Sequence, residues 1–167
     1  TTDSDIVTEI ASRLAKKCGF IVFPTFSYGI SDEHNPLSNI NMKYSHLRTF
    51  LIDIMQSLLE NGVKNFFILN GHHGNEKVRD MMGRNANKRI MVPRVTFENT
   101  SVPRHDDGGI RMRWCPIYSY WRFMKHEFDH AGFVETSLML AISDKVKMKK
   151  AKKGLITKGL SEKEIQR

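Results

Sequence analysis

Two short apolar runs, each preceded by a segment with helical spacing of apolar residues, constrain the fold of this chain most. The first covers residues 20–23 and stops at Pro24, and the second covers residues 65–69, Asn-Phe-Phe-Ile-Leu. Apolar runs of this length are typical of strands that are buried on both faces of a sheet. Strands that alternate with helices form right-handed crossovers, which place helices on both faces of the sheet. We therefore predict an α/β fold, a three-layer α/β/α domain with a mainly parallel sheet.

Four segments are predicted to be helical, residues 5–18, 42–61, 76–87 and 134–142. In the first two, apolar side chains recur at three- and four-residue spacing, and Gly19 and Gly62 end the pattern. The Thr-Asp-Ser run at residues 2–4 offers N-cap oxygens for the first helix. A third strand is predicted over residues 90–97, and the aromatic segment 114–121 is expected to lie in the core.

Length, cysteine content and hydropathy fit one domain in a reducing compartment. The 167 residues suffice to build a hydrophobic core. Cys18 and Cys115 are the two cysteines, too few for a disulfide scaffold. No apolar run approaches the ~20 residues that a membrane span needs. We therefore predict a cytoplasmic protein without a membrane partner.

Positive charge is concentrated at the C-terminal end of the chain. The net charge is +8, but nine Lys or Arg and two Glu lie between Lys145 and Arg167, which leaves the other 144 residues at +1. A domain that binds nucleic acid carries its basic groups along a face or groove. We therefore divide the chain into a domain over residues 1–146 and a basic C-terminal segment over residues 147–167. We expect this segment to be solvated, with no nucleic acid as partner.

The end of the second predicted strand is a candidate site for chemistry. Residues 70–75, Asn-Gly-His-His-Gly-Asn, follow that strand directly. In open α/β sheets, ligands bind outside the carboxyl ends of the strands. Glycine lets the backbone fold close beside a ligand, and neutral imidazole binds transition metals. On local chemistry alone, a metal-binding turn and a merely exposed turn both remain open.

A second group of polar residues surrounds His130. Asp129 precedes this histidine directly, Glu127 lies three residues before it, and Glu135 lies five residues after it. Such a concentration of acid and base groups suits proton transfer. The alternative is an ordinary loop histidine followed by a glutamate that favours a helix N-terminus.

Four motifs occur along the chain in a fixed order. They are Thr-Asp before the first helix, Tyr-Gly-x-Ser-x-Glu-His at residues 28–34, Asn-Gly-His-x-Gly-Asn at residues 70–75, and His-Ala-Gly-x-x-Glu-Thr-Ser at residues 130–137. Together these motifs resemble the creatininase (creatinine amidohydrolase) family. The resemblance extends from Thr2 to about Val146 and does not cover the basic segment.

The resemblance implies a metal-dependent amidohydrolase with a creatininase-like α/β fold. It implies two divalent metal ions (Zn, Mn or Fe) as cofactors, a small-molecule amide as substrate, and a homo-oligomer, hexameric or built from dimers. Asp3 resembles the carboxylate that bridges the two metals. His72 resembles a ligand of one of them.

The resemblance also implies roles for four further residues. His73 falls at a position that binds substrate. His130 resembles the catalytic histidine that handles protons, and Glu127 is its acidic catalytic neighbour. Glu135 belongs to the Glu-Thr-Ser element, where we expect it either to bind a metal or to support a metal ligand.

Two departures from the family pattern bear on the substrate and on the metal site. Creatininase itself has a ligating Glu where this sequence has Gly74, while other members have Gly, which points away from creatinine. The alternatives are a formamide deformylase that acts on a pyrimidine nucleotide in flavin or deazaflavin synthesis, and an inactive member kept for assembly. The family's Glu-x-His ligands lie upstream of the Thr-Asp pair. The chain is then a fragment, which we favour, or a remnant with an incomplete metal site.

Overall fold

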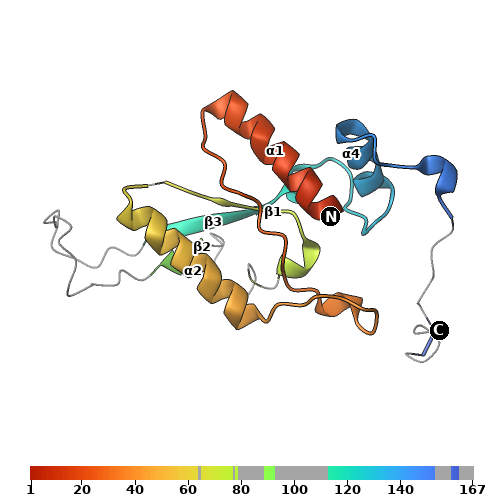
Figure 1. Ribbon diagram of the computed structural model, residues 1–167, viewed down its shortest axis with the longest axis horizontal. Helices are drawn as coiled ribbons and strands as arrows, with labels where there is room; N and C mark the ends of the chain where they lie inside the picture. The colour runs from red at the N-terminus through yellow and green to blue at the C-terminus, as the bar shows by residue number, and fades with distance from the viewer. Residues whose placement is uncertain (64, 77, 79–88, 93–112, 153–158, 162–167) are drawn as a thin grey trace, which may run out of the picture.

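The computed structural model describes residues 1–63, 65–76, 78, 89–92, 113–152 and 159–161 (Figure 1). Its helices are α1 (Thr2–Cys18), α2 (Tyr44–Glu60) and α4 (Phe133–Ile142), and its strands are β1 (Ile68–Asn70), β2 (Arg89–Val92) and β3 (Arg113–Ser119). Four short 3₁₀ helices complete the described elements, η1 (Asp32–His34), η2 (His73–Asn75), η3 (Tyr120–Phe123) and η4 (Met148–Lys150).

The three strands form one small sheet with β3 in the middle. β3 pairs in parallel with β1, where Ile68 lies opposite Ile117. It pairs antiparallel with β2, where Ile90 lies opposite Cys115. Helices around a sheet with a parallel pair agree with the α/β class. The described sheet is mixed rather than mainly parallel, and the three-layer arrangement stays a prediction.

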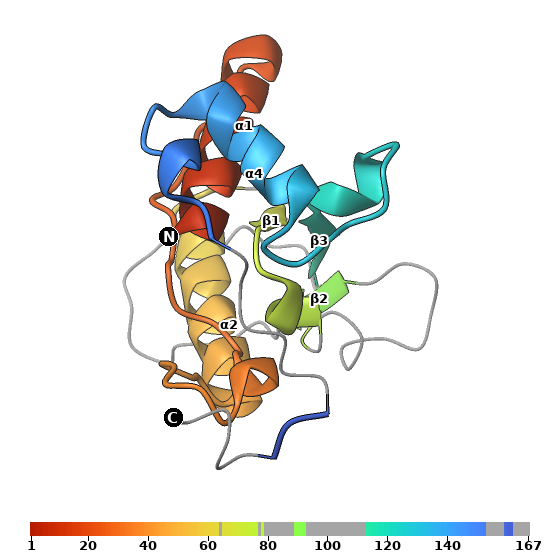
Figure 2. The ribbon, with the colours of Figure 1, turned by 90° about the vertical axis from the view of Figure 1, so that its right-hand side faces the viewer.

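Two hydrophobic clusters hold the elements together. The first joins α2 to the sheet, with Leu47 and Met55 of α2 packed against Cys115 and Ile117 of β3. The second joins α1, η3 and α4, with Ile6, Tyr120, Trp121 and Met139 as its buried members. As a result α2 packs against the sheet, while α1 and α4 pack against each other and α1 also contacts β1 (Figures 1 and 2).

The predicted helices over residues 5–18, 42–61 and 134–142 are confirmed, with small shifts of their ends. α1 begins at Thr2, because the Oγ1 of Thr1 accepts a hydrogen bond from the backbone N–H of Ser4 at 3.3 Å and caps the helix. The cap is therefore Thr1 rather than a residue of the 2–4 run, and Asp3 lies inside the first turn. Gly19 ends α1 with a left-handed φ of 72°, which glycine adopts without steric cost.

The prediction of a buried strand over residues 20–23 is wrong. This segment forms no strand, and its side chains are exposed, with 89% exposure for Ile21. An apolar run becomes a buried strand only where another strand pairs with it, and β1 pairs with β3 in the described part of the chain. The second predicted strand is confirmed but begins at Ile68 rather than at residue 65.

The segment after residue 112 forms a strand that the sequence did not indicate. β3 contains Pro116, which cannot donate a ladder hydrogen bond and argues against a central strand. β2 confirms the start of the strand predicted over residues 90–97. Its remainder lies outside the described residues, as does most of the helix predicted over residues 76–87. Among the described residues, no helix is both long and apolar enough to cross a membrane.

Candidate metal centre and active site

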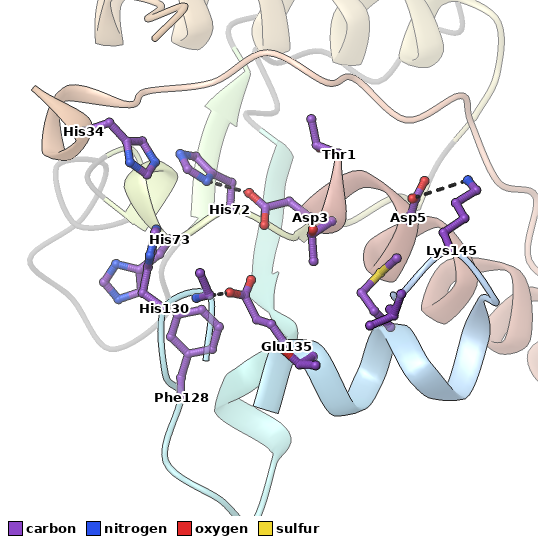
Figure 3. Close-up of a pocket in the computed structure, with 15 residues that line it drawn as sticks. Thr1, Asp3, Asp5, His34, His72, His73, Phe128, His130, Glu135 and Lys145 are labelled. Atoms are coloured by element: carbon purple, nitrogen blue, oxygen red, sulfur yellow. Dashed lines mark hydrogen bonds and ion pairs between the residues drawn. The ribbon is translucent and has the colours of Figure 1, made fainter. Parts of the chain in front are cut away.

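An open cavity of about 590 Å³ lies at the N-terminal end of α1 (Figure 3). Its walls come from the start of α1, from η1, from the turn after β1, from the loop before α4 and from α4 itself. The lining residues with titratable side chains are Asp3, Asp5, His34, His72, His73, His130, Glu135 and Lys145. Segments that are far apart in the sequence therefore bring imidazoles and carboxylates to one hollow.

Asp3 and His72 form the central contact of the cavity. The Nδ1 of His72 lies 2.7 Å from the Oδ2 of Asp3, and the two side chains are 18% and 33% exposed. The contact requires α1 to lie very close to the turn after β1. A Cβ on Gly71 would lie 2.8 Å from the Cβ of Val7, so glycine allows this approach.

Oxygen atoms surround the second nitrogen of the His72 ring. Its Nε2 lies 2.9 Å from the carbonyl oxygen of Ile30, 3.3 Å from the Oγ of Ser31 and 3.3 Å from the Oε1 of Glu33. The hydrogen bond to Asp3 raises the pKa of His72, while partial burial opposes that effect; the charges of Asp3 and Glu33 add to the rise. The ring therefore lies in a place that favours positive charge.

The 3₁₀ helix η1 brings Glu33 and His34 to the cavity. The backbone N–H of Ile30 donates to the Oδ1 of Asn75 at 3.0 Å, which ties the loop before η1 to the turn after β1. Glu33, His34 and His72 each offer one ligand atom, and these atoms lie within 4.8 Å of one another. The Glu-His pair stood in one of the sequence motifs, but no role was predicted for it.

The loop before α4 brings His130 and Glu135 to the opposite side of the cavity. The carboxylate of Glu135 accepts a hydrogen bond from the backbone N–H of Ala131, and Asp129 accepts one from the N–H of Val134 at 2.9 Å. These bonds fix the loop on the first turn of α4. Burial raises the pKa of Glu135, and the nearby charge of Asp3 raises it further, although the Ala131 N–H opposes the change. The ring of His130 lies 5.2 Å from that of His34, centroid to centroid.

Aromatic rings form the wall beside His73. The imidazole of His73 stacks on Phe128 with ring centroids 5.5 Å apart and an angle of 3° between the planes. Trp121 lies 5.6 Å from His73 and 4.9 Å from Phe128, again between centroids. This wall offers flat, largely apolar surface next to the polar groups of the cavity.

One buried hydroxyl near the site lacks a partner. The Oη of Tyr120 makes no hydrogen bond in the part of the chain that the structure describes, although the residue is only 5% exposed. Burial raises the pKa of Tyr120, and the carboxylates of Glu135, Asp3 and Asp129 raise it further. This hydroxyl therefore lies among carboxylates that do not satisfy it.

Five of the six predicted site residues line the same cavity, namely Asp3, His72, His73, His130 and Glu135. Glu127 does not line it, and its side chain is exposed. Imidazole nitrogens with carboxylate oxygens are ligands that suit Zn²⁺, Mn²⁺ and Fe²⁺. The residues present thus fit the metal ions that the sequence motifs implied. An α/β fold with such a cavity after a strand end belongs to the class of candidate metal-binding enzymes.

Comparison with known proteins places the chain within this class. The family described as Creatininase, creatinine amidohydrolase, matches residues 1–166, and the chain belongs to that family. A creatinine amidohydrolase of Pseudomonas putida is 24% identical over 157 residues, which make up 81% of this chain and 54% of that protein. The chain thus spans about half the length of this relative. No solved structure matches it significantly.

Proposed function

We propose that this chain carries the active site of a metal-dependent amidohydrolase, which uses divalent metal ions to hydrolyse a C–N amide bond in a small molecule. The observation that carries this proposal is the convergence of Asp3, His72, His130 and Glu135 on one open cavity. Family membership supports the same reaction class. The number of metals, expected to be two, and a homo-oligomeric state remain part of the proposal.

Asp3 and His72 are the residues that would hold metal in this cavity. When bound, a divalent ion lowers the pKa of a coordinated water toward neutrality and so supplies a hydroxide nucleophile. Asp3 contributes a carboxylate from the first turn of α1, where the helix dipole favours negative charge. Asp3 and His72 hold each other in place through their 2.7 Å contact.

His130 is the residue that we assign to proton transfer. Its ring lines the cavity from a loop whose position is fixed by the Asp129 and Glu135 hydrogen bonds. Imidazole exchanges protons near neutral pH, so His130 can protonate the leaving nitrogen when the amide bond breaks. Glu135 holds the loop of His130 through the Ala131 N–H, and its carboxylate also faces Asp3 across the site.

His73 and Phe128 are the residues that we assign to substrate positioning. Their stacked rings offer a flat face beside the polar groups, and a planar amide or heterocycle would lie against it. This wall is compatible with a cyclic amide such as creatinine and with the formamide of a pyrimidine nucleotide, the alternative substrate. An inactive family member kept for assembly would keep the fold without turnover.

Hydrolysis assays on metal-loaded protein test this proposal. The protein would be loaded with Zn²⁺, Mn²⁺ or Fe²⁺ and incubated with creatinine and with a formamidopyrimidine nucleotide. We expect turnover of one of these amides, lost with a chelator and restored by metal. Metal retention without turnover of either amide would favour the inactive alternative, and protein that retains no metal would contradict the proposed mechanism.

A further inference from the structure

Glu33 and His34 lie in the cavity, but the mechanism proposed above does not use them. Both belong to η1, and both approach the side of the His72 ring that faces away from Asp3. The Oε1 of Glu33 lies 3.3 Å from the Nε2 of His72, and the ring centroid of His34 lies 6.2 Å from that of His72 (Figure 3). Both residues are therefore placed to share a ligand with His72.

The missing side chain of Gly74 makes this approach possible. Gly74 is buried, and a Cβ at this position would overlap the carbonyl oxygen of Ile30 and the Oε1 of Glu33. It would also lie 2.8 Å from the Nε2 of His72. The turn after β1 thus leaves a space beside His72, and the carboxylate of Glu33 enters that space from another segment of the chain.

Two loop contacts hold η1 in this position. Besides the bond from Ile30 to Asn75, the backbone N–H of Ser31 donates to the Oδ1 of Asn41 at 2.8 Å. At the base of the loop, the N–H of Met42 donates to the carbonyl oxygen of Gly29 at 2.9 Å. A loop that is closed at its base and tied to β1 brings Glu33 to His72 by its own backbone contacts, with no ligand needed to place it.

The surroundings of His72 are those of a metal-binding imidazole. A metal-bound histidine commonly donates its other ring N–H to a carboxylate, which orients the ring and makes the ligand nitrogen more basic. Asp3 stands at Nδ1 in this way, which leaves Nε2 directed at Glu33. One carboxylate oxygen and two imidazole nitrogens match the ligand preferences of Zn²⁺ and related divalent ions.

We propose that Glu33, His34 and the Nε2 of His72 form a divalent-cation site, with Glu33 as its carboxylate ligand. This inference rests on the proposed function, because His72 belongs to both. It adds η1 to the metal-binding part of the chain and gives Asp3 the role of orienting His72 at this ion. The second oxygen of Asp3 remains available for another ion.

Titration of the metal-free chain with Zn²⁺ and Co²⁺ tests the site without any activity assay. Calorimetry would give the affinity, and the Co²⁺ absorption spectrum would report on the ligands. Removing a residue that merely supports a metal ligand costs about 10–100-fold in affinity, so we expect Glu33→Gln and His34→Gln each to weaken binding at least about tenfold. NMR of the wild type should show the ring signals of His34 and His72 shifting together as Zn²⁺ is added.

Asp32→Asn is the matched control, because it removes a negative charge from the same turn outside the proposed ligand group. An exposed carboxylate that only adds negative potential contributes little, so its affinity should stay within about twofold of wild type. Equal losses in Asp32→Asn and Glu33→Gln would reduce the effect to charge and overturn the inference. Thermal unfolding with chelator would check that the variants fold.

Two outcomes separate this inference from the proposed function. If His72→Gln abolishes metal binding while Glu33→Gln and His34→Gln bind like wild type, the site at η1 is refuted and the proposed function stands. If the wild-type chain binds neither Zn²⁺ nor Co²⁺, both are refuted. An unmoved His34 signal at saturating Zn²⁺ would also overturn the inference.

Discussion

Asp3 and His72 are 69 residues apart in the sequence, yet the Oδ2 of Asp3 lies 2.7 Å from the Nδ1 of His72. This contact connects the first turn of α1 with the turn after β1. It depends on Gly71, whose missing side chain lets α1 approach the backbone of that turn. Both candidate metal-binding elements are therefore fixed by one ion-pair contact between a helix and a strand end.

The pH dependence of stability should report this contact in metal-free protein. The pKa of His72 is raised from its ordinary value of 6.5, first by the hydrogen bond to Asp3. The folded state thus binds the imidazole proton more tightly than the unfolded state does. The stability from this pair is fully present below pH 6.5 and is lost as the pH rises through the raised pKa.

Denaturant unfolding in chelator at several pH values would measure this effect. We expect His72→Gln to be less stable than wild type below pH 6.5, with the difference shrinking as the pH rises above that value. His46→Gln, an exposed position on α2, controls for the loss of an imidazole. A difference between wild type and His72→Gln that does not change with pH would contradict the assignment.

Glu135 should show a pH effect of its own, because burial raises its pKa above the ordinary 4.5. The folded state holds the carboxyl proton more tightly, so the unfolded state ionises first as the pH rises. Stability falls from pH 4.5 up to the raised pKa and is constant above it. Glu135→Gln removes this penalty and keeps an acceptor for the Ala131 N–H.

Metal-free Glu135→Gln is therefore expected to be more stable than wild type at neutral pH and to approach it near pH 4. Thermal unfolding in chelator at pH 4 and pH 7 would measure this. Glu127→Gln is the control, since Glu127 is exposed outside the cavity. A Glu135→Gln variant that is less stable than wild type at pH 7 would show that the charged carboxylate stabilises the fold.

The helices could be predicted from sequence, because their signals are local. The apolar spacing of α2 and the glycine after it lie within one segment, and the observed Tyr44–Glu60 agrees with the prediction for residues 42–61. Strand burial depends on distant partners. The run at residues 20–23 has the composition of a buried strand, but the structure pairs Ile68 with Ile117 instead.

The candidate site divides in the same way. His72 and His130 stood in distinctive motifs, and both line the cavity. Glu33 and His34 were in a motif as well, but their position beside His72 depends on the bond between Ile30 and Asn75, which joins residues 45 apart. Spacing along the chain carries no information about that bond, so the sequence alone assigned these two residues no role.

Gly74→Ala is expected to destabilise the turn after β1. Its Cβ would overlap the carbonyl oxygen of Ile30, which is backbone and cannot turn aside like a flexible side chain. Overpacking of this kind typically costs about 1–3 kcal/mol. Chemical denaturation would measure the loss, with Gly62→Ala as the comparison, because a Cβ on Gly62 meets no atom within 4 Å and strains only the backbone at φ 83°. A wild-type unfolding midpoint for Gly74→Ala would show that η1 moves away at little cost.

His130→Ala separates proton transfer from metal binding. If His130 protonates the leaving nitrogen, its loss should lower kcat by ~10²–10⁴-fold, the usual contribution of general acid–base catalysis. Metal content, measured by elemental analysis, should barely change, because His130 lies outside the group of residues that the structure places around a candidate cation. His72→Ala should instead lower metal content and activity together, since a lost ligand weakens the site that generates hydroxide. The two variants are best compared in the same metal-loaded assay. A His130→Ala protein with wild-type kcat would exclude the proton-transfer role, and one that loses its metal would place His130 among the ligands.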